Sequence, residues 1–257
     1  TVGDATGTGG IGGDGIRSDG NLKIEGKANI GTAQGGNGKF TGGYGINSTS
    51  SNDLTISSEA KIGTAQGGDG KTTGGSGIYS GSELTIKDNA TITNATGGSG
   101  KQGGSGILGK TMKILASTIQ KAIGGRVTGE DGTGGNGICS GNDLAISGSA
   151  SITNATGGSG KWGGDGIFSE HDLTISGSAN IGTAQGGVGQ TFGGYGICSN
   201  NNVKISGGTI TKAKGGNATG TNSGDGGHGI YSDGALTISD SAKIQNATGG
   251  DGNTTGG

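Results

Sequence analysis

Residues 77–107 read GIYSGSELTIKDNATITNATGGSGKQGGSGI, and this stretch decides the fold. It opens and closes on the dipeptide Gly-Ile. Between the two dipeptides lie two short segments in which apolar and polar residues alternate, followed by a glycine-rich segment. Alternation with a period of two is typical of β-strands, and glycine clusters are typical of turns and loops. The stretch therefore predicts a unit of short strands closed by a glycine-rich loop.

The same unit recurs along the whole chain. The isoleucine of the dipeptide returns after 29 to 33 residues, at Ile16, Ile46, Ile78, Ile107, Ile138, Ile167, Ile197 and Ile230. Each is followed by an apolar-x-Ile pair, such as Leu84 and Ile86, and then by a small residue before another isoleucine, such as Ala90 and Ile92. Eight repeats of one supersecondary unit predict a repeat architecture.

Three short strands in a repeat of this length describe a triangular coil. One coil cannot bury its own apolar face, but coils stacked about 4.8 Å apart form a continuous core of isoleucine ladders. We therefore expect an all-β, right-handed parallel β-helix (β-solenoid) of about eight coils, with residues 1–257 as a single domain. The least regular stretch is 112–123, which loses the usual turn residues but keeps the ladder positions Ile114 and Ile119.

The composition agrees with this fold. Glycine supplies 69 of 257 residues, hydrophobic residues only 26%, and proline none. This content is too low in apolar residues for a conventional globular core, and the absence of proline suits a backbone whose N–H groups bond to neighbouring strands. No helix is expected after the glycine-rich loops, so we interpret them as places of close backbone approach rather than as phosphate-binding loops.

Charge and hydropathy exclude two classes of partner. The formal net charge is -2 with no basic block, so nucleic acid is not expected, and no apolar run is long enough to predict membrane insertion. The sequence runs from one glycine-rich stretch, 3–13, to another, 249–257. We expect an uncapped segment of a longer array, or copies that join end to end or side by side, outside the cell or on its surface.

One position, directly after the dipeptide, should point outward because the isoleucine before it points inward. It is occupied by Arg17, Asn47, Tyr79, Leu108, Cys139, Phe168, Cys198 and Tyr231. We name Tyr79, Leu108, Phe168 and Tyr231, with the loop residues Trp162 and Phe192, as a candidate stripe for ligand binding or self-association. Burial under the protein's own loops is the alternative. The two cysteines lie two coils apart, which predicts free thiols.

A second row could bind calcium. Asp53, Glu83, Asp143 and Asp172 precede the Leu-x-Ile strands and would stack in adjacent coils, and oxygen ligands suit this ion. The alternative is that each side chain caps the local backbone. No cleft-forming insertion and no repeated association of histidine with serine or cysteine accompanies these carboxylates, so we expect no catalytic residues, no enzyme activity and no cofactor other than a possible calcium ion.

The segments GIYSDGALTIS (229–239) and GIRSDGNLKI (15–24) resemble the β-helical carbohydrate-binding proteins of clostridia and the glycine-rich repeat surface proteins of Gram-positive bacteria. The resemblance implies secretion, a parallel β-helix and contact with polysaccharide. The long glycine-rich loop in each coil departs from that pattern. We expect a non-catalytic extracellular structural or adhesive β-solenoid, a fibre or cell-surface scaffold segment; a carbohydrate-binding module for cell-wall or plant polysaccharide is the alternative.

Overall fold

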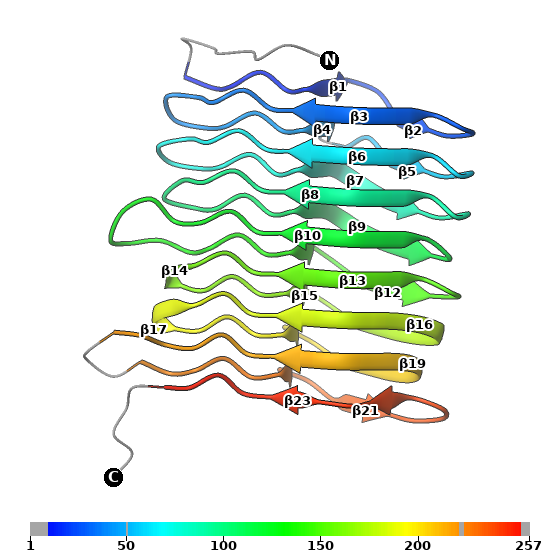
Figure 1. The fold of residues 1–257 in the computed structure, drawn as a ribbon, viewed down its shortest axis with the longest axis vertical. Coiled ribbons are helices and arrows are strands. Elements are labelled where there is room, and N and C mark those ends of the chain that lie inside the picture. The colour runs from blue at the N-terminus through cyan, green and yellow to red at the C-terminus, as the bar shows by residue number, and fades with distance from the viewer. Residues whose placement is uncertain (1–9, 50, 221–223, 253–257) are drawn as a thin grey trace.

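The computed structural model describes residues 10–49, 51–220 and 224–252. These residues form a parallel β-solenoid with strands on every coil and with no helix in the ranges described (Figure 1). No described segment is therefore a helix long and apolar enough to cross a bilayer. The expected all-β, stacked-coil architecture is confirmed.

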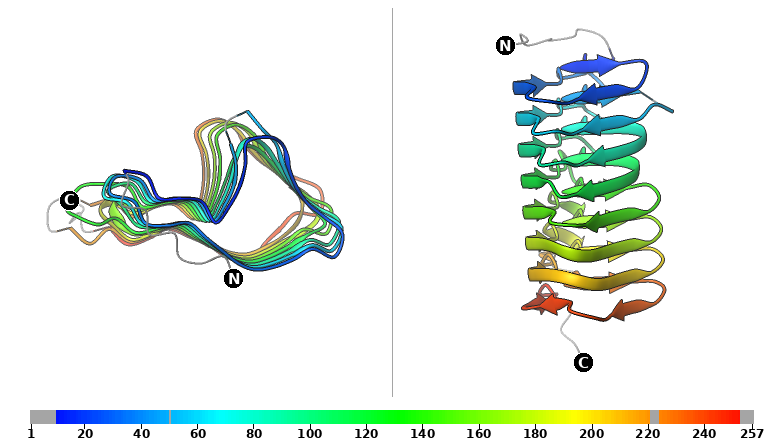
Figure 2. Two further views of the ribbon diagram at one scale, coloured as in Figure 1. Left: turned by 90° about the horizontal axis from the view of Figure 1, so that it is seen from above. Right: turned by 90° about the vertical axis from the view of Figure 1, so that its right-hand side faces the viewer.

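Each coil contributes three strand positions around a triangular core (Figure 2). The first position is held by β1 (Ile16–Ser18), β4 (Ile46–Ser48), the start of β7 (Ile78–Ile86) and of β9 (Ile107–Leu115), β11 (Ile138–Ser140), β15 (Ile167–Ser169), β18 (Ile197–Ser199) and β20 (Ile230–Ser232). The second is held by β2 (Leu22–Ile24), β5 (Leu54–Ile56), the ends of β7 and β9, β12 (Leu144–Ser147), the start of β16 (Leu173–Gln185) and of β19 (Val203–Lys214), and β21 (Leu236–Ile238). The third is held by β3 (Asn29–Gln34), β6 (Lys61–Gln66), β8 (Thr91–Thr96), β10 (Thr118–Ile123), β13 (Ser151–Thr156), the ends of β16 and β19, β22 (Lys243–Ile244) and β23 (Ala247–Thr248).

The register places equivalent residues directly over one another. Ile46 pairs with Ile78, and Ile78 pairs with Ile107. All three are fully buried, as are the isoleucines of the other two strand positions in the central coils. One repeat therefore makes one coil, and the isoleucine ladders form the core as the sequence predicts. In the last described coil Leu236 and Ile238 are exposed, because no further described coil covers them.

Several strands continue around a corner, which the sequence pattern does not predict. The strand β16 runs from the second position into the third because Ser176 and Gly177 keep their pairing to Ser206 and Gly207 across the corner. The irregular stretch 112–123 is also strand on both sides of a corner at Ala116, whose φ is 43°. The corner at Ala116 thus forms without the turn residues that the other repeats use there.

The glycine-rich segments form an ordered extension on one side of the triangular core (Figure 2). In each coil an outgoing segment leaves the third strand position, and a return segment leads back to the next Gly-Ile. The two layers are joined by a zigzag of backbone hydrogen bonds: the Gly43 N–H donates to Gly36 O at 2.9 Å, and the Gly68 N–H donates to Gly43 O at 2.8 Å. Two short strands, β14 (Gly160–Trp162) and β17 (Gly189–Phe192), lie near its edge.

This zigzag leaves no room for side chains between the layers. A Cβ built on Gly42 would lie 1.7 Å from the carbonyl oxygen of Gly68, and one on Gly43 would lie 2.1 Å from that of Gly13. The same collision recurs in the following coils. The glycines are therefore required by close backbone approach, as expected, but the approach is between two layers as well as between successive coils.

The close approach predicts a large cost for one added methyl group. A Cβ on Gly74, in a return segment, would lie 1.9 Å from the carbonyl oxygen of Gly98, in an outgoing segment, whereas a Cβ on Gly31 meets nothing within 4 Å. We expect Gly74→Ala to reduce the free energy of unfolding by about 2–4 kcal/mol, because the backbone of one layer must shift away from the other. The matched control Gly31→Ala should stay within about 0.5 kcal/mol of the parent. Urea unfolding followed by circular dichroism measures both, and equal stability of the two variants would contradict the two-layer packing.

Candidate functional site

The return segments carry three columns of outward-facing residues that run along the solenoid. Within a coil the columns are three residues apart: two glycines separate the edge column from the middle column, and the Gly-Ile dipeptide separates the middle column from the corner column. The edge column is Ile11, Thr41, Thr73, Gln102, Thr133, Trp162, Phe192 and Asp225. The middle column is Asp14, Tyr44, Ser76, Ser105, Asn136, Asp165, Tyr195 and His228. The corner column, on the first strand position, is Arg17, Asn47, Tyr79, Leu108, Cys139, Phe168, Cys198 and Tyr231.

Contacts between the columns show that they share one face. Asn47 Nδ2 donates to Asp14 Oδ2 at 2.6 Å, which joins the corner and middle columns. The rings of Tyr44 and Tyr79 stack with their centroids 4.6 Å apart. Middle-column residues also support the backbone, since the Tyr195 N–H donates to Asp165 Oδ1 at 2.6 Å. We call this surface the three-column face.

Aromatic and acidic side chains gather on this face in coils six to eight. Tyr195 lies at the centre of the cluster: its ring stacks on His228 at 5.5 Å and on Tyr231 at 4.8 Å between centroids. Tyr231 also donates its hydroxyl hydrogen to Asp233. In coils three to five the middle column holds only Ser76, Ser105 and Asn136, so the face there lacks this cluster.

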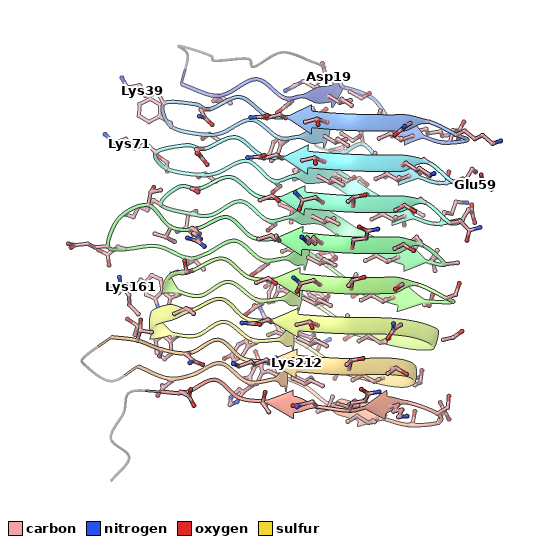
Figure 3. All side chains as sticks on the ribbon, viewed as in Figure 1. Asp19, Lys39, Glu59, Lys71, Lys161 and Lys212 are labelled. Atoms are coloured by element: carbon pink, nitrogen blue, oxygen red, sulfur yellow. The ribbon has the colours of Figure 1, made fainter. Side chains whose placement is uncertain are left out.

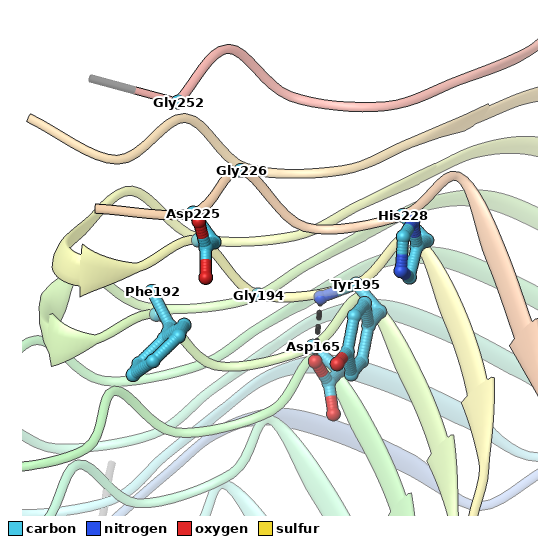
Figure 4. Close-up of a pocket in the computed structure, with 10 residues that line it drawn as sticks. Asp165, Phe192, Gly194, Tyr195, Asp225, Gly226, His228 and Gly252 are labelled. Atoms are coloured by element: carbon cyan, nitrogen blue, oxygen red, sulfur yellow. Dashed lines mark hydrogen bonds between the residues drawn. The ribbon is translucent and has the colours of Figure 1, made fainter. Parts of the chain in front are cut away.

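A hollow of about 700 Å³ opens between the edge and middle columns of these coils (Figure 4). Phe192 and Asp225 line it from the edge column, and Asp165, Tyr195 and His228 line it from the middle column. The floor between the columns is glycine backbone, at Gly163, Gly193, Gly194 and Gly226, and Gly252 of the last outgoing segment also lines the hollow. Three residues of extended chain separate the columns, about 9 Å at the rise of a polyproline II segment. The hollow is thus a trough with aromatic and carboxylate walls.

The carboxyl group of Asp165 has an altered acidity. Burial raises its pKa to about 7, against the opposing effect of the hydrogen bond from the Tyr195 N–H. The hydrogen bond to Asp233 raises the pKa of the Tyr231 hydroxyl to about 12. The trough therefore holds one carboxyl that takes up and releases a proton near neutral pH.

The stripe residues predicted from the sequence lie on this face. Tyr79, Leu108 and Phe168 are half-buried in the corner between the core and the extension, so they are neither fully outward nor covered. Tyr231 is half-buried and lies against the aromatic cluster, whereas Cys198 is buried. The structure does not bring the predicted stripe residues together in one site the size of a ligand, because the corner column extends over eight coils.

The two loop aromatics lie side by side at the edge of the extension. Trp162 pairs in register with Phe192 in the next coil, and the two side chains are 39% and 45% exposed. Of the predicted stripe residues, only Phe192 lines the hollow. Within the hollow, the exposed ring of Phe192 is therefore the apolar surface that a ligand can contact.

The carboxylates predicted as calcium ligands have backbone partners. Asp53 Oδ1 accepts the N–H of Glu83 at 3.1 Å, and Asp143 Oδ1 accepts the N–H of Asp172 at 3.2 Å. Glu83 instead pairs with Lys113, whose Nζ lies 2.7 Å from Glu83 Oε2. In the part of the chain that the structure describes, no group of three or more histidine, cysteine or acidic side chains gathers as a metal site would require. The row contains backbone-capping residues, and calcium binding along it stays a prediction.

Both cysteines are free, as the coil spacing predicts. Phe168 lies between them in register, one coil from each. Burial raises the pKa of the Cys139 thiol to about 11. A thiol of this kind is protonated at neutral pH and is a poor nucleophile.

Sequence reasoning missed four residues of the hollow: Asp165, Tyr195, Asp225 and His228. Their signal is a spacing of three, as in Phe192, Tyr195 and Cys198, rather than the period of two used to find the strands. This spacing becomes meaningful only when the glycines between the columns are known to pack against a second layer.

Comparisons with known proteins give no relative from which to transfer a function. Neither a protein-family model, nor a curated protein, nor a solved structure matches the chain. Any function must therefore be argued from the site itself.

The acidity of Asp165 predicts a pH-dependent stability. Its folded pKa of about 7 lies above the value of about 3.9 expected for an unfolded chain. The folded state therefore binds more protons between these two values, and this group makes the protein less stable as the pH rises from about 4 to about 7. Asp165→Asn should remove that decline and melt at a higher temperature than the parent at pH 8.

Asparagine suits this position because Asn136, one coil earlier, accepts the Asp165 N–H through its Oδ1 at 2.7 Å. Thermal unfolding of parent and variant at intervals from pH 4 to pH 8 measures the difference. A constant difference in melting temperature across this range would show that the Asp165 carboxyl has an ordinary pKa.

Proposed function

We propose that the protein is a non-catalytic extracellular β-solenoid that binds polysaccharide on its three-column face, at coils six to eight. The observation that carries this proposal is the trough of about 700 Å³, in which an exposed Phe192 ring faces carboxylate and aromatic side chains across a glycine floor. The volume is in the range of about 300–1,000 Å³ that is common for ligand sites.

The chemistry of the walls suits a sugar. The apolar face of a pyranose ring packs on an exposed aromatic ring, and its hydroxyl groups need hydrogen-bond acceptors close by. Asp165 and Asp225 supply carboxylate acceptors, and the hydroxyl of Tyr195 adds a further polar group. The absence of side chains on the glycine floor lets a sugar ring approach the backbone.

The shape favours a polymer over a single sugar. The trough is open, and Trp162 lies one coil from Phe192 along the edge column. Successive coils are about 4.8 Å apart, so a chain lying along the edge column would pass Trp162, Phe192 and Asp225 in turn. Polymers of this kind occur outside cells, which accords with the extracellular location that the Gly-Ile-x-Ser segments suggest.

A purely structural role is the second candidate. The observation that favours it is the unbroken coil-to-coil pairing from β1 to β20 at the first strand position, which makes the protein a stiff rod. As a scaffold or fibre segment it would associate with copies of itself. Both candidates are non-catalytic.

The first candidate predicts that binding depends on Phe192. Affinity electrophoresis with cellulosic, chitin-derived, chitosan and pectic polymers identifies the retarding polymer, and calorimetry with its oligomers gives the affinity. We expect Phe192→Ala to weaken binding about two- to tenfold, because a ring contact contributes about 0.5–1.5 kcal/mol. Phe40→Ala is the matched control, since Phe40 is also an exposed edge residue, at 51%, but lies in coil two. Absence of retardation by every polymer would overturn the proposal.

The structural candidate makes a separate prediction. If it holds, negative-stain electron microscopy of the purified protein should show rods that lengthen or align as the concentration rises. Sedimentation velocity over the same range checks the result in solution. Single short particles at all concentrations, together with retardation by a polysaccharide, would leave only the binding function.

A further inference from the structure

The trough has two acidic side chains and, apart from the imidazole of His228, no basic one. Its lining includes Asp165 and Asp225, and it includes no lysine or arginine. The ion pairs between described residues involve other carboxylates, on Asp14, Asp19, Glu83, Asp88 and Asp131. The carboxylates of the trough are thus available to a cationic group from outside the chain.

The same edge of the extension already pairs ammonium groups with aromatic rings. Lys39 Nζ lies 5.4 Å from the centroid of Phe40, and Lys161 Nζ lies 5.1 Å from the centroid of Trp162. These distances are within the range of cation–π attraction. The lysine precedes the aromatic residue in both pairs, and it projects from the edge of the extension in coils two and six (Figure 3).

Phe192 differs from these two rings. The residue before it is Thr191, and no described lysine or arginine lies over its ring. Its neighbour in the next coil is Asp225, with which it pairs in register. The position that the lysine ammonium takes at Trp162 is therefore free at Phe192, and a carboxylate lies beside it on the trough side (Figure 4).

We propose that the trough binds the free amino group of an amino-sugar polymer of the polyglucosamine type, an inference that rests on the proposed polysaccharide binding. The ammonium group lies between the Phe192 ring and the Asp225 carboxylate, with Asp165 as the second acidic wall. A pyranose ring rests on the glycine floor. An N-acetylated sugar lacks this charge, and a uronic acid is repelled by both carboxylates.

The acidity of Asp165 fits this occupant. A half-buried carboxyl with a pKa near neutrality becomes ionised when a cation is placed beside it, because an opposite charge lowers the pKa. The ionisable groups near it are Tyr195 and His228 on its own face, Asp225 at the edge, and the thiols of Cys139 and Cys198 in the corner column; none of them is a lysine or an arginine. Binding should therefore weaken when salt is added, as expected for charges open to solvent.

Four probes separate the possible ligands: hexamers of glucosamine, of N-acetylglucosamine and of galacturonate, and a hexalysine peptide. Calorimetry at near-neutral pH and low salt measures each with the full chain. We expect the glucosamine hexamer to bind at least tenfold more tightly than the N-acetylated and galacturonate hexamers. Asp225→Asn should remove most of that preference, and Asp165→Asn part of it.

The matched control is Asp69→Asn. Asp69 Oδ1 accepts the Ser99 N–H at 2.6 Å, the same backbone contact that Asp165 makes, but on the outgoing segment and not in the trough. This variant should keep the affinity and preference of the parent. A loss of preference in Asp69→Asn equal to that in Asp225→Asn would mean that overall charge, not the trough, selects the ligand, and would overturn the inference.

The remaining outcomes distinguish this inference from the proposed function. Equal or tighter binding of the N-acetylated or galacturonate hexamer overturns the amino-sugar inference and leaves polysaccharide binding in place. Tighter binding of hexalysine than of glucosamine hexamer assigns the trough to a basic peptide and overturns the inference. Failure of all three sugar hexamers to bind, together with no retardation by any polymer, overturns both.

Discussion

Backbone hydrogen bonding between successive coils is the interaction on which the rest of the structure depends. It fixes equivalent residues one over another at the spacing of neighbouring β-strands, so that each sequence position becomes a column. The isoleucine positions become the core, and the positions after them become the corner column. Asparagine and aspartate also take part, since Asn37 Oδ1 accepts the Asp69 N–H at 2.7 Å and so extends the ladder through a side chain. A binding face on this protein is therefore a set of columns, and its chemistry varies by coil.

The glycine-rich extension is a second consequence of the same pairing. Once the coils are fixed, the outgoing and return segments meet across the extension, and each offers N–H groups that need acceptors. The zigzag from Gly43 to Gly36 and from Gly68 to Gly43 satisfies them, but only without side chains. The same absence of side chains creates the smooth floor of the trough. Structure and candidate site thus have one cause, the close approach of two backbone layers.

Much of the fold could be predicted because its signals are local and repeated. The ladder positions, including Ile114 and Ile119 in the irregular stretch 112–123, follow from the period of two and are buried as expected. The corner column follows the inward isoleucine in every coil, but the structure buries two of its members, Asn47 and Cys198. The sequence does not predict the burial of this column, because that depends on the extension, and the structure gives an intermediate exposure for Tyr79, Leu108 and Phe168. The trough residues Asp165 and Asp225 were not found, because they are adjacent only through the packing of coils six to eight.

The sequence by itself determined the coil, the number of stacked units, the core ladders and the free cysteines. Each of these follows from a residue type recurring at a fixed interval, and a parallel stack turns such an interval into a contact. Only the tertiary structure decided that the glycine-rich segments form a two-layer extension and that a trough opens beside Phe192. The physical reason is that glycine has no side chain whose size or polarity would indicate which part of the chain it packs against. Which backbone it approaches is settled by the register of the strands on either side, and so are the position and charge of the site above it.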